Sequence, residues 1–164
     1  MSQTKAQLID AAATFTISSD ASFNSVTVGK GANSVSGNTV LGEGALDASV
    51  SGGNNTAIGI SALTENTSGQ ENTAVGRLAL DANTTGNDNV AIGNAALTNA
   101  TTANNNTAVG SRCLLTNSTG TGNTGVGHDC LESSTTSDNN TAMGFETMKS
   151  NTTGTRNTAI GSLA

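Results

Sequence analysis

The chain has no proline, tryptophan or tyrosine, and only three of its 164 residues are phenylalanine. Globular cores usually draw much of their buried area from aromatic and large aliphatic side chains. Charged residues are also scarce, at 11% of the chain, and the six cations are scattered along an acidic sequence of net charge −6. Binding to nucleic acid is therefore not expected. Nor is membrane insertion, because no apolar run approaches the roughly 20 residues of a membrane span.

An unbroken 17-residue repeat organises most of the sequence. Each repeat has an asparagine, an aliphatic residue or methionine three positions later, a glycine next, and in most repeats a leucine four positions after the glycine. The repeated glycines are Gly42, Gly59, Gly76, Gly93, Gly110, Gly127, Gly144 and Gly161. A short fixed period is typical of a solenoid, in which each repeat forms one coil and equivalent residues stack.

The coils are predicted to be β rather than α, so the fold class is an all-β parallel β-solenoid with 17-residue coils. Each repeat contains a short strand-like motif, such as residues 89–93, followed by a polar turn. A repeat of 17 residues is too short for a helical hairpin. Stacking at roughly 4.8 Å per coil gives a rod section roughly 35–40 Å long.

A thin core is expected to fill the coils. Its members would be the aliphatic column before the glycines, the leucines after them and the small alanines at positions such as Ala45, Ala62, Ala79 and Ala96. The aliphatic column is Leu41, Ile58, Val75, Ile92, Val109, Val126, Met143 and Ile160.

The N-terminal part departs from the repeat. Residues 24–37 resemble a coil with its turn removed, since the interval from Gly29 to Gly42 is shorter than the interval between any two later repeated glycines. A short helix is expected between Thr4 and Ala12, followed by a strand from Thr14 to Ser18. We therefore expect residues 1–23 to be an attachment or capping segment and residues 24–164 to be the solenoid domain.

Two columns of polar or reactive residues have structural interpretations. The repeated asparagines are expected to hydrogen-bond from coil to coil as an amide ladder. Cys113 and Cys130, which are separated by one repeat, are expected to be reduced core residues. Neighbouring parallel side chains fit the dihedral angle of a disulfide poorly.

No constellation for catalysis, cofactor binding or metal binding is found. His128 is the only histidine, and it has only Asp129 beside it, whereas nucleophilic catalysis needs a nucleophile, a base and an orienting group. The stretch that starts at Asp81 briefly resembles a calcium loop, but Ile92 stands where the loop needs glutamate. The chain is therefore expected not to be an enzyme.

Adjacent hydroxyl residues form two rows along the turns. If the rows formed a glycan-binding or ice-binding surface, the contacts would be made by Thr84, Thr85, Thr101, Thr102, Ser118, Thr119, Thr135 and Thr136. Adjacent residues of a strand point to opposite faces, so both rows cannot share one flat strand face. A structural turn is the favoured interpretation.

A rod with so little core would gain by burying a face against identical chains, and cyclic closure into a homotrimer is expected. The phrase Asn89-Val90-Ala91-Ile92-Gly93 and its equivalents resemble the head repeats of trimeric autotransporter adhesins. That resemblance implies a left-handed β-roll of three chains. The 17-residue period departs from the length of those repeats.

The polar stretches Asn83–Gly86 and Asn151–Gly154 make the whole run resemble the repeats of bacteriophage tail fibres and other virion appendages. No signal peptide or membrane anchor of the autotransporter kind is recognised in the sequence. We therefore expect a non-enzymatic virion protein, made in the host cytoplasm, that forms a rigid trimeric rod in a tail fibre, spike or capsid-surface appendage. Its N-terminal segment would contact other virion proteins. The alternative is an adhesin module that binds a host-surface glycan, with an ice-binding protein third.

Overall fold

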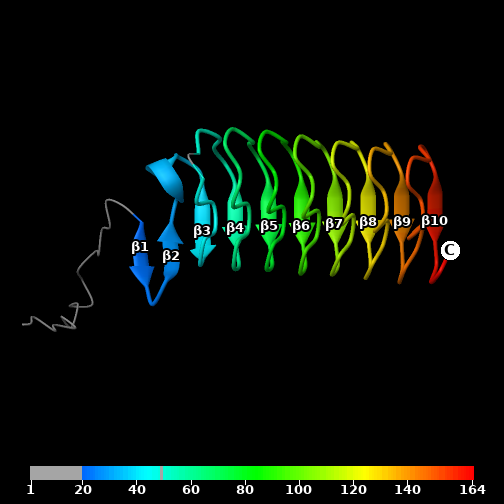
Figure 1. Ribbon diagram of the computed structural model, residues 1–164, viewed down its shortest axis with the longest axis horizontal. Coiled ribbons are helices and arrows are strands. Elements are labelled where there is room, and N and C mark those ends of the chain that lie inside the picture. The colour runs from blue at the N-terminus through cyan, green and yellow to red at the C-terminus, as the bar shows by residue number, and fades with distance from the viewer. Residues whose placement is uncertain (1–19, 49) are drawn as a thin grey trace, which may run out of the picture.

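The computed structural model of the chain describes residues 20–48 and 50–164. The expected helix between Thr4 and Ala12 and the expected strand from Thr14 to Ser18 lie outside these residues. Within the described residues ten strands form one sheet in sequence order, and Figure 1 shows them standing side by side along the long axis of the molecule.

One short strand comes from each repeat. The strands are β3 (Thr39–Gly42), β4 (Thr56–Ile58), β5 (Thr73–Val75), β6 (Val90–Ile92), β7 (Thr107–Val109), β8 (Thr124–Val126), β9 (Thr141–Met143) and β10 (Thr158–Ile160). They pair in parallel and in register, so that Ala74 lies opposite Ala91. Outside the strands the coils also bond to one another, as where the N–H of Leu63 donates to the carbonyl of Ala79 at 3.0 Å. The predicted parallel β-solenoid with 17-residue coils is confirmed.

The stretch 24–37 is not the shortened coil that its sequence suggests. Strands β1 (Ala21–Phe23) and β2 (Val26–Gly29) pair antiparallel, β2 pairs antiparallel with β3, and a short 3₁₀ turn, η1 (Ala32–Ser34), follows β2. The reason is the two-residue loop, in which Asn24 and Ser25 have φ values of 49° and 68°. Positive φ at both positions is the geometry that joins antiparallel strands in a tight hairpin.

The core differs from the prediction in one column. From β3 to β9 the middle of the strand is buried, as Ala91 is, whereas the residues on either side of it face outward. The aliphatic column before the glycines therefore lies on the outer face, and Leu41, Ile92 and Met143 are 46%, 40% and 47% exposed. The cause is the alternation of strand side chains, since the small alanine leaves the room inside the coil that the opposite leucines fill. The predicted burial of the leucines and of the Ala45 column is confirmed.

The buried leucines have an unusual backbone. Leu97 has φ of 51°, and its equivalents in the other coils share this left-handed conformation; they are Leu46, Leu63, Leu80, Leu114, Leu131 and Met148. Side chains branched at Cβ are strongly disfavoured there. This explains why valine and isoleucine occur on the outer strand face but never in the leucine column.

Exchanging isomers between the two columns tests this explanation. We expect Leu97→Ile to lower the free energy of unfolding by about 2 kcal/mol, because it adds a branched Cβ at positive φ to the cost of repacking. The matched change Ile92→Leu, on the exposed face, should stay within about 0.5 kcal/mol. Denaturant unfolding measures both variants, and equal losses would contradict the explanation.

The predicted amide ladder is confirmed. Asn89 donates through Nδ2 to Asn72 Oδ1 at 3.0 Å and to the carbonyl of Ala103 at 2.8 Å. Its own Oδ1 accepts from the backbone N–H of Asn106 at 3.0 Å. The same bonds recur from coil to coil, with the asparagines from Asn38 to Asn140 buried or nearly so. The ladder therefore satisfies backbone groups at the corner where each strand begins.

The two cysteines are free and fully buried, as predicted. They replace alanine in the Ala45 column, and the strand residue beside them is Gly125 instead of alanine. A Cβ on Gly125 would lie 2.5 Å from Cys113 Sγ, so the glycine makes room for the larger sulfur. A hydrogen bond with Cys130, together with burial, raises the pKa of the Cys113 thiol and keeps it protonated.

Candidate functional site

The outer face of the parallel strands carries an uncharged aliphatic column along its whole length. The aliphatic column from Leu41 to Ile160 runs beside a column of threonines, which Val90 interrupts in β6. Neither column contains a charged residue, although the chain has 12 acidic and 6 basic residues. Exposed apolar patches rimmed by polar residues commonly mark interaction surfaces. We call this surface the outer strand face.

The two hydroxyl rows on the turns are placed differently from one another. Side chains of the first row donate to a backbone carbonyl of the next coil, as Thr84 Oγ1 does to Thr101 and Thr101 Oγ1 does to Ser118, at 3.0 and 3.3 Å. Ser118 and Thr135 do the same. The first row thus holds the coils together. The second row is exposed on the surface and contains Thr85, Thr102, Thr119 and Thr136.

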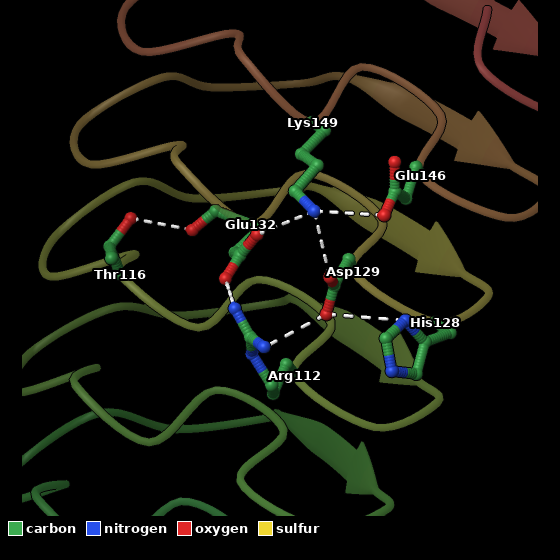
Figure 2. A network of polar contacts seen from close by, with 7 residues as sticks. All are labelled: Arg112, Thr116, His128, Asp129, Glu132, Glu146 and Lys149. Carbon is green, nitrogen blue, oxygen red and sulfur yellow. Dashed lines mark hydrogen bonds and ion pairs between the residues drawn. The ribbon is translucent and has the colours of Figure 1, made fainter.

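Three consecutive coils carry a network of ion pairs (Figure 2). Asp129 lies at its centre, with Lys149 Nζ 2.9 Å from Oδ2 and Arg112 Nε 3.4 Å from Oδ1. Glu132 pairs with the other end of the Arg112 guanidinium and lies 3.4 Å from Lys149 Nζ, and Glu146 lies 2.9 Å from the same ammonium. Lys149 therefore links carboxylates of two consecutive coils, whereas Arg112 pairs with two carboxylates of the coil that follows its own.

The burial of Asp129 sets the electrostatics of the network. Its side chain is only 4% exposed, whereas those of Arg112 and Lys149 are 45% and 35% exposed. The hydrogen bonds to Asp129 and Glu146 raise the pKa of Lys149 above its ordinary value, so its ammonium stays charged. A buried carboxylate needs such compensation, because removing it from water is costly.

An aromatic pair lies beside this network. His128 and Phe145 occupy the position after the glycine in consecutive coils, and their rings stack with centroids 5.6 Å apart and planes 16° apart. Phe145 is 50% exposed, and the side chain of His128 is 49% exposed. His128 Nδ1 also lies 3.3 Å from Asp129 Oδ1, which connects the pair to the ion network.

The sequence period already carried a signal for this site. Arg112, Asp129 and Glu146 follow one another at intervals of one repeat, as do Glu132 and Lys149, and His128 and Phe145. Once the coils are stacked, those spacings place opposite charges and two rings next to each other. The individual residues give no such signal, because they are related by the repeat period and do not form a local sequence motif.

The groups at the site can stack and form hydrogen bonds. The network holds carboxylates, a guanidinium, an ammonium and an imidazole. In the part of the chain that the structure describes, no group of three or more histidine, cysteine or acidic residues is arranged to hold a metal ion. Within the same residues no helix is long and apolar enough to span a bilayer.

Comparison of the chain with known protein families, with curated proteins and with solved structures gives no match.

Proposed function

We propose that the chain is a non-enzymatic structural protein of a bacteriophage virion. It forms a rigid, left-handed homotrimeric rod in a tail fibre, spike or capsid-surface appendage. The observation that supports self-association is the outer strand face, which carries one uncharged aliphatic column over eight coils, every member of it exposed or half-buried. The resemblance of the repeats to those of phage appendages supports the place in a virion.

The outer strand face suits a copy of the same chain. A strip that repeats every coil is complementary to itself in register, and closed rotational symmetry buries it on every copy. Its centre lies in the coil of residues 89–105, which contains no charged residue at all. Two copies can therefore meet there without burying an ion. The rods would gain stiffness, because each thin coil then packs against coils of its neighbours.

Light scattering coupled to size-exclusion chromatography tests the assembly. We expect a mass of about three times the 16.1 kDa of one chain. The double variant Ile92→Lys/Val109→Lys places two charges at the centre of the face and should yield monomers, because unpaired buried charges are costly. A wild-type protein that keeps the mass of a single chain at every concentration up to the limit of its solubility would refute the trimer.

The control for these variants lies on another side of the coil. Thr102→Lys adds the same side chain to an exposed turn and should leave the mass unchanged. Dissociation of this control would mean that added charge, and not its position, drives the effect.

Virion membership has a separate test that does not depend on assembly. Capsid and tail genes beside the open reading frame, together with antibody labelling of purified particles, are the expected result. A gene neighbourhood without virion genes and particles without label would contradict this part of the proposal.

A further inference from the structure

The stacked rings of His128 and Phe145 are exposed to solvent, although the chain has almost no aromatic residues. At the equivalent position, three other coils carry the polar residues Asn94, Ser111 and Ser162. A coil can therefore be built with a small polar side chain there. Phe145 nevertheless stays half exposed, although it stacks on His128. The two rings cover one face of each other, and the remaining half of each side chain is open to whatever meets the surface.

The ion network beside the rings is likewise not needed to build a coil. The column of Arg112, Asp129 and Glu146 holds Ser61, Leu78 and Ala95 in earlier coils. Exposed ion pairs contribute little to stability, and the buried carboxylate of Asp129 has a desolvation cost. What the network does achieve is to fix several donors and acceptors in place next to the ring of His128 (Figure 2).

We propose that this surface, formed by the His128–Phe145 rings and the adjoining network, is a binding site for a saccharide. The apolar C–H face of a pyranose ring packs against the exposed part of the stacked rings, chiefly that of Phe145. Its hydroxyls bond to the partly exposed side chains of Arg112, Glu146 and Lys149. Ligand sites commonly combine apolar or aromatic contact area with a few fixed polar groups. The site shares no residue with the outer strand face or with the hydroxyl rows of the turns.

The charges of the network select the kind of sugar. Three carboxylates, those of Asp129, Glu132 and Glu146, surround two cations, Arg112 and Lys149. With the carboxylates in excess and the cations already paired, a carboxylated or phosphorylated sugar is disfavoured. A neutral hexose with free hydroxyls is therefore the expected ligand.

A second copy of the chain fits this surface less well than it fits the outer strand face. Covering Arg112 and Lys149 with another subunit would desolvate charges that are 45% and 35% exposed. A bound sugar leaves much of this charged surface in contact with water. Its own hydroxyls can replace the water contacts that are lost.

An array of bacterial surface oligosaccharides, with neutral and uronic-acid-containing members, tests the site on the full chain. We expect neutral members to bind, and titration calorimetry on the strongest of them should give a weaker affinity for Phe145→Ser by at least about tenfold, as for loss of a stacked ring. Glu146→Ala, which copies Ala95, should also weaken binding. Both variants copy residues of other coils and should keep the melting temperature within a few degrees.

Ile60→Ser is the matched control, since Ile60 occupies the same position in an early coil and is 51% exposed. Its affinity should equal that of the wild type. The proposal is overturned if no member of the array binds, or if binding survives Phe145→Ser. It is also overturned if Phe145→Ser dissociates the assembly, which would make the rings a subunit contact.

Discussion

The Gly93→Ala variant is expected to lower the free energy of unfolding by about 4 kcal/mol or more. Gly93 follows β6 with φ of 133°, a region that side chains with a Cβ rarely enter. A Cβ there would lie 2.5 Å from the carbonyl oxygen of Gly110 and 2.6 Å from its carbon. These are backbone atoms of the next coil, so relief requires the two coils to move apart. Chemical denaturation with a circular-dichroism readout measures the loss.

Gly44→Ala provides the control for this variant. Gly44 also has positive φ, 63°, but the nearest atom to an added Cβ is Ser61 Oγ at 3.6 Å. Ala95 occupies the equivalent position with φ of 54°. The control should therefore lose less than about 1 kcal/mol. If the two substitutions have similar effects, close stacking of the glycines is not what limits the coil.

The Asn89→Ala variant is expected to cost about 3–5 kcal/mol, because its side chain satisfies several groups at once. The asparagine donates to Asn72 and Ala103 and accepts from Asn106. Its removal leaves a backbone carbonyl and a backbone N–H without their partners at a buried corner. Each unsatisfied buried group costs roughly 1–3 kcal/mol. Hydrogen exchange should locate the effect, with the Asn106 amide losing protection first.

Asn94→Ala removes the same kind of side chain from the same coil at an exposed position. It should change the free energy of unfolding by less than about 0.5 kcal/mol. A small loss for Asn89→Ala, comparable to that of the control, would show that the ladder contributes little and that the leucine column holds the coils together.

The repeat made most of the architecture predictable. A fixed 17-residue spacing implies stacked coils, and stacking in turn implies the amide ladder and the buried leucines. The prediction that the aliphatic column lies in the core is wrong, because residue type alone does not give the direction of a strand side chain. Alternation puts Ala91 inside and Ile92 outside, and hydropathy cannot show this when the strand is as short as β6.

Residues 24–37 show a second limit of the repeat. Their strand phrase matches the coils, but its pairing direction depends on the backbone of Asn24 and Ser25, where the chain reverses. Two residues at positive φ decide between a coil and a hairpin. Nothing in the strand phrase itself carries that information.

A further signal was present in the sequence as paired variation. From Asn66 onward, most coils have an asparagine and, three positions later, a glycine, as at Asn83 and Gly86. Where the asparagine changes in this part of the chain, the glycine changes too, giving Ala100 with Ala103 and Ser134 with Ser137. The two positions are in contact, since a Cβ on Gly86 would lie 2.4 Å from Asn83 Oδ1, besides 2.2 Å from the carbonyl oxygen of Ala103. Comparing the sequences of the coils with one another thus reveals contacting positions, as comparing the sequences of homologous proteins would.

The candidate site could be predicted only after the coils were stacked. Its residues are ordinary surface types, and their importance comes from neighbours one repeat away. Repeat spacing alone does not give the backbone angles. These angles determine how exposed the rings are, how deeply the Asp129 carboxylate is buried and how long the ion-pair distances are.

Because β3 to β10 pair in strict register, the length of the rod is set by the number of its coils. Adding or removing one whole coil would change the length of the rod by a step of about 4.8 Å and leave every column intact. Inserting a single residue would instead shift each ladder out of alignment beyond that point. Duplication of 17-residue units is therefore the simplest route by which such a protein can be adjusted to a new distance.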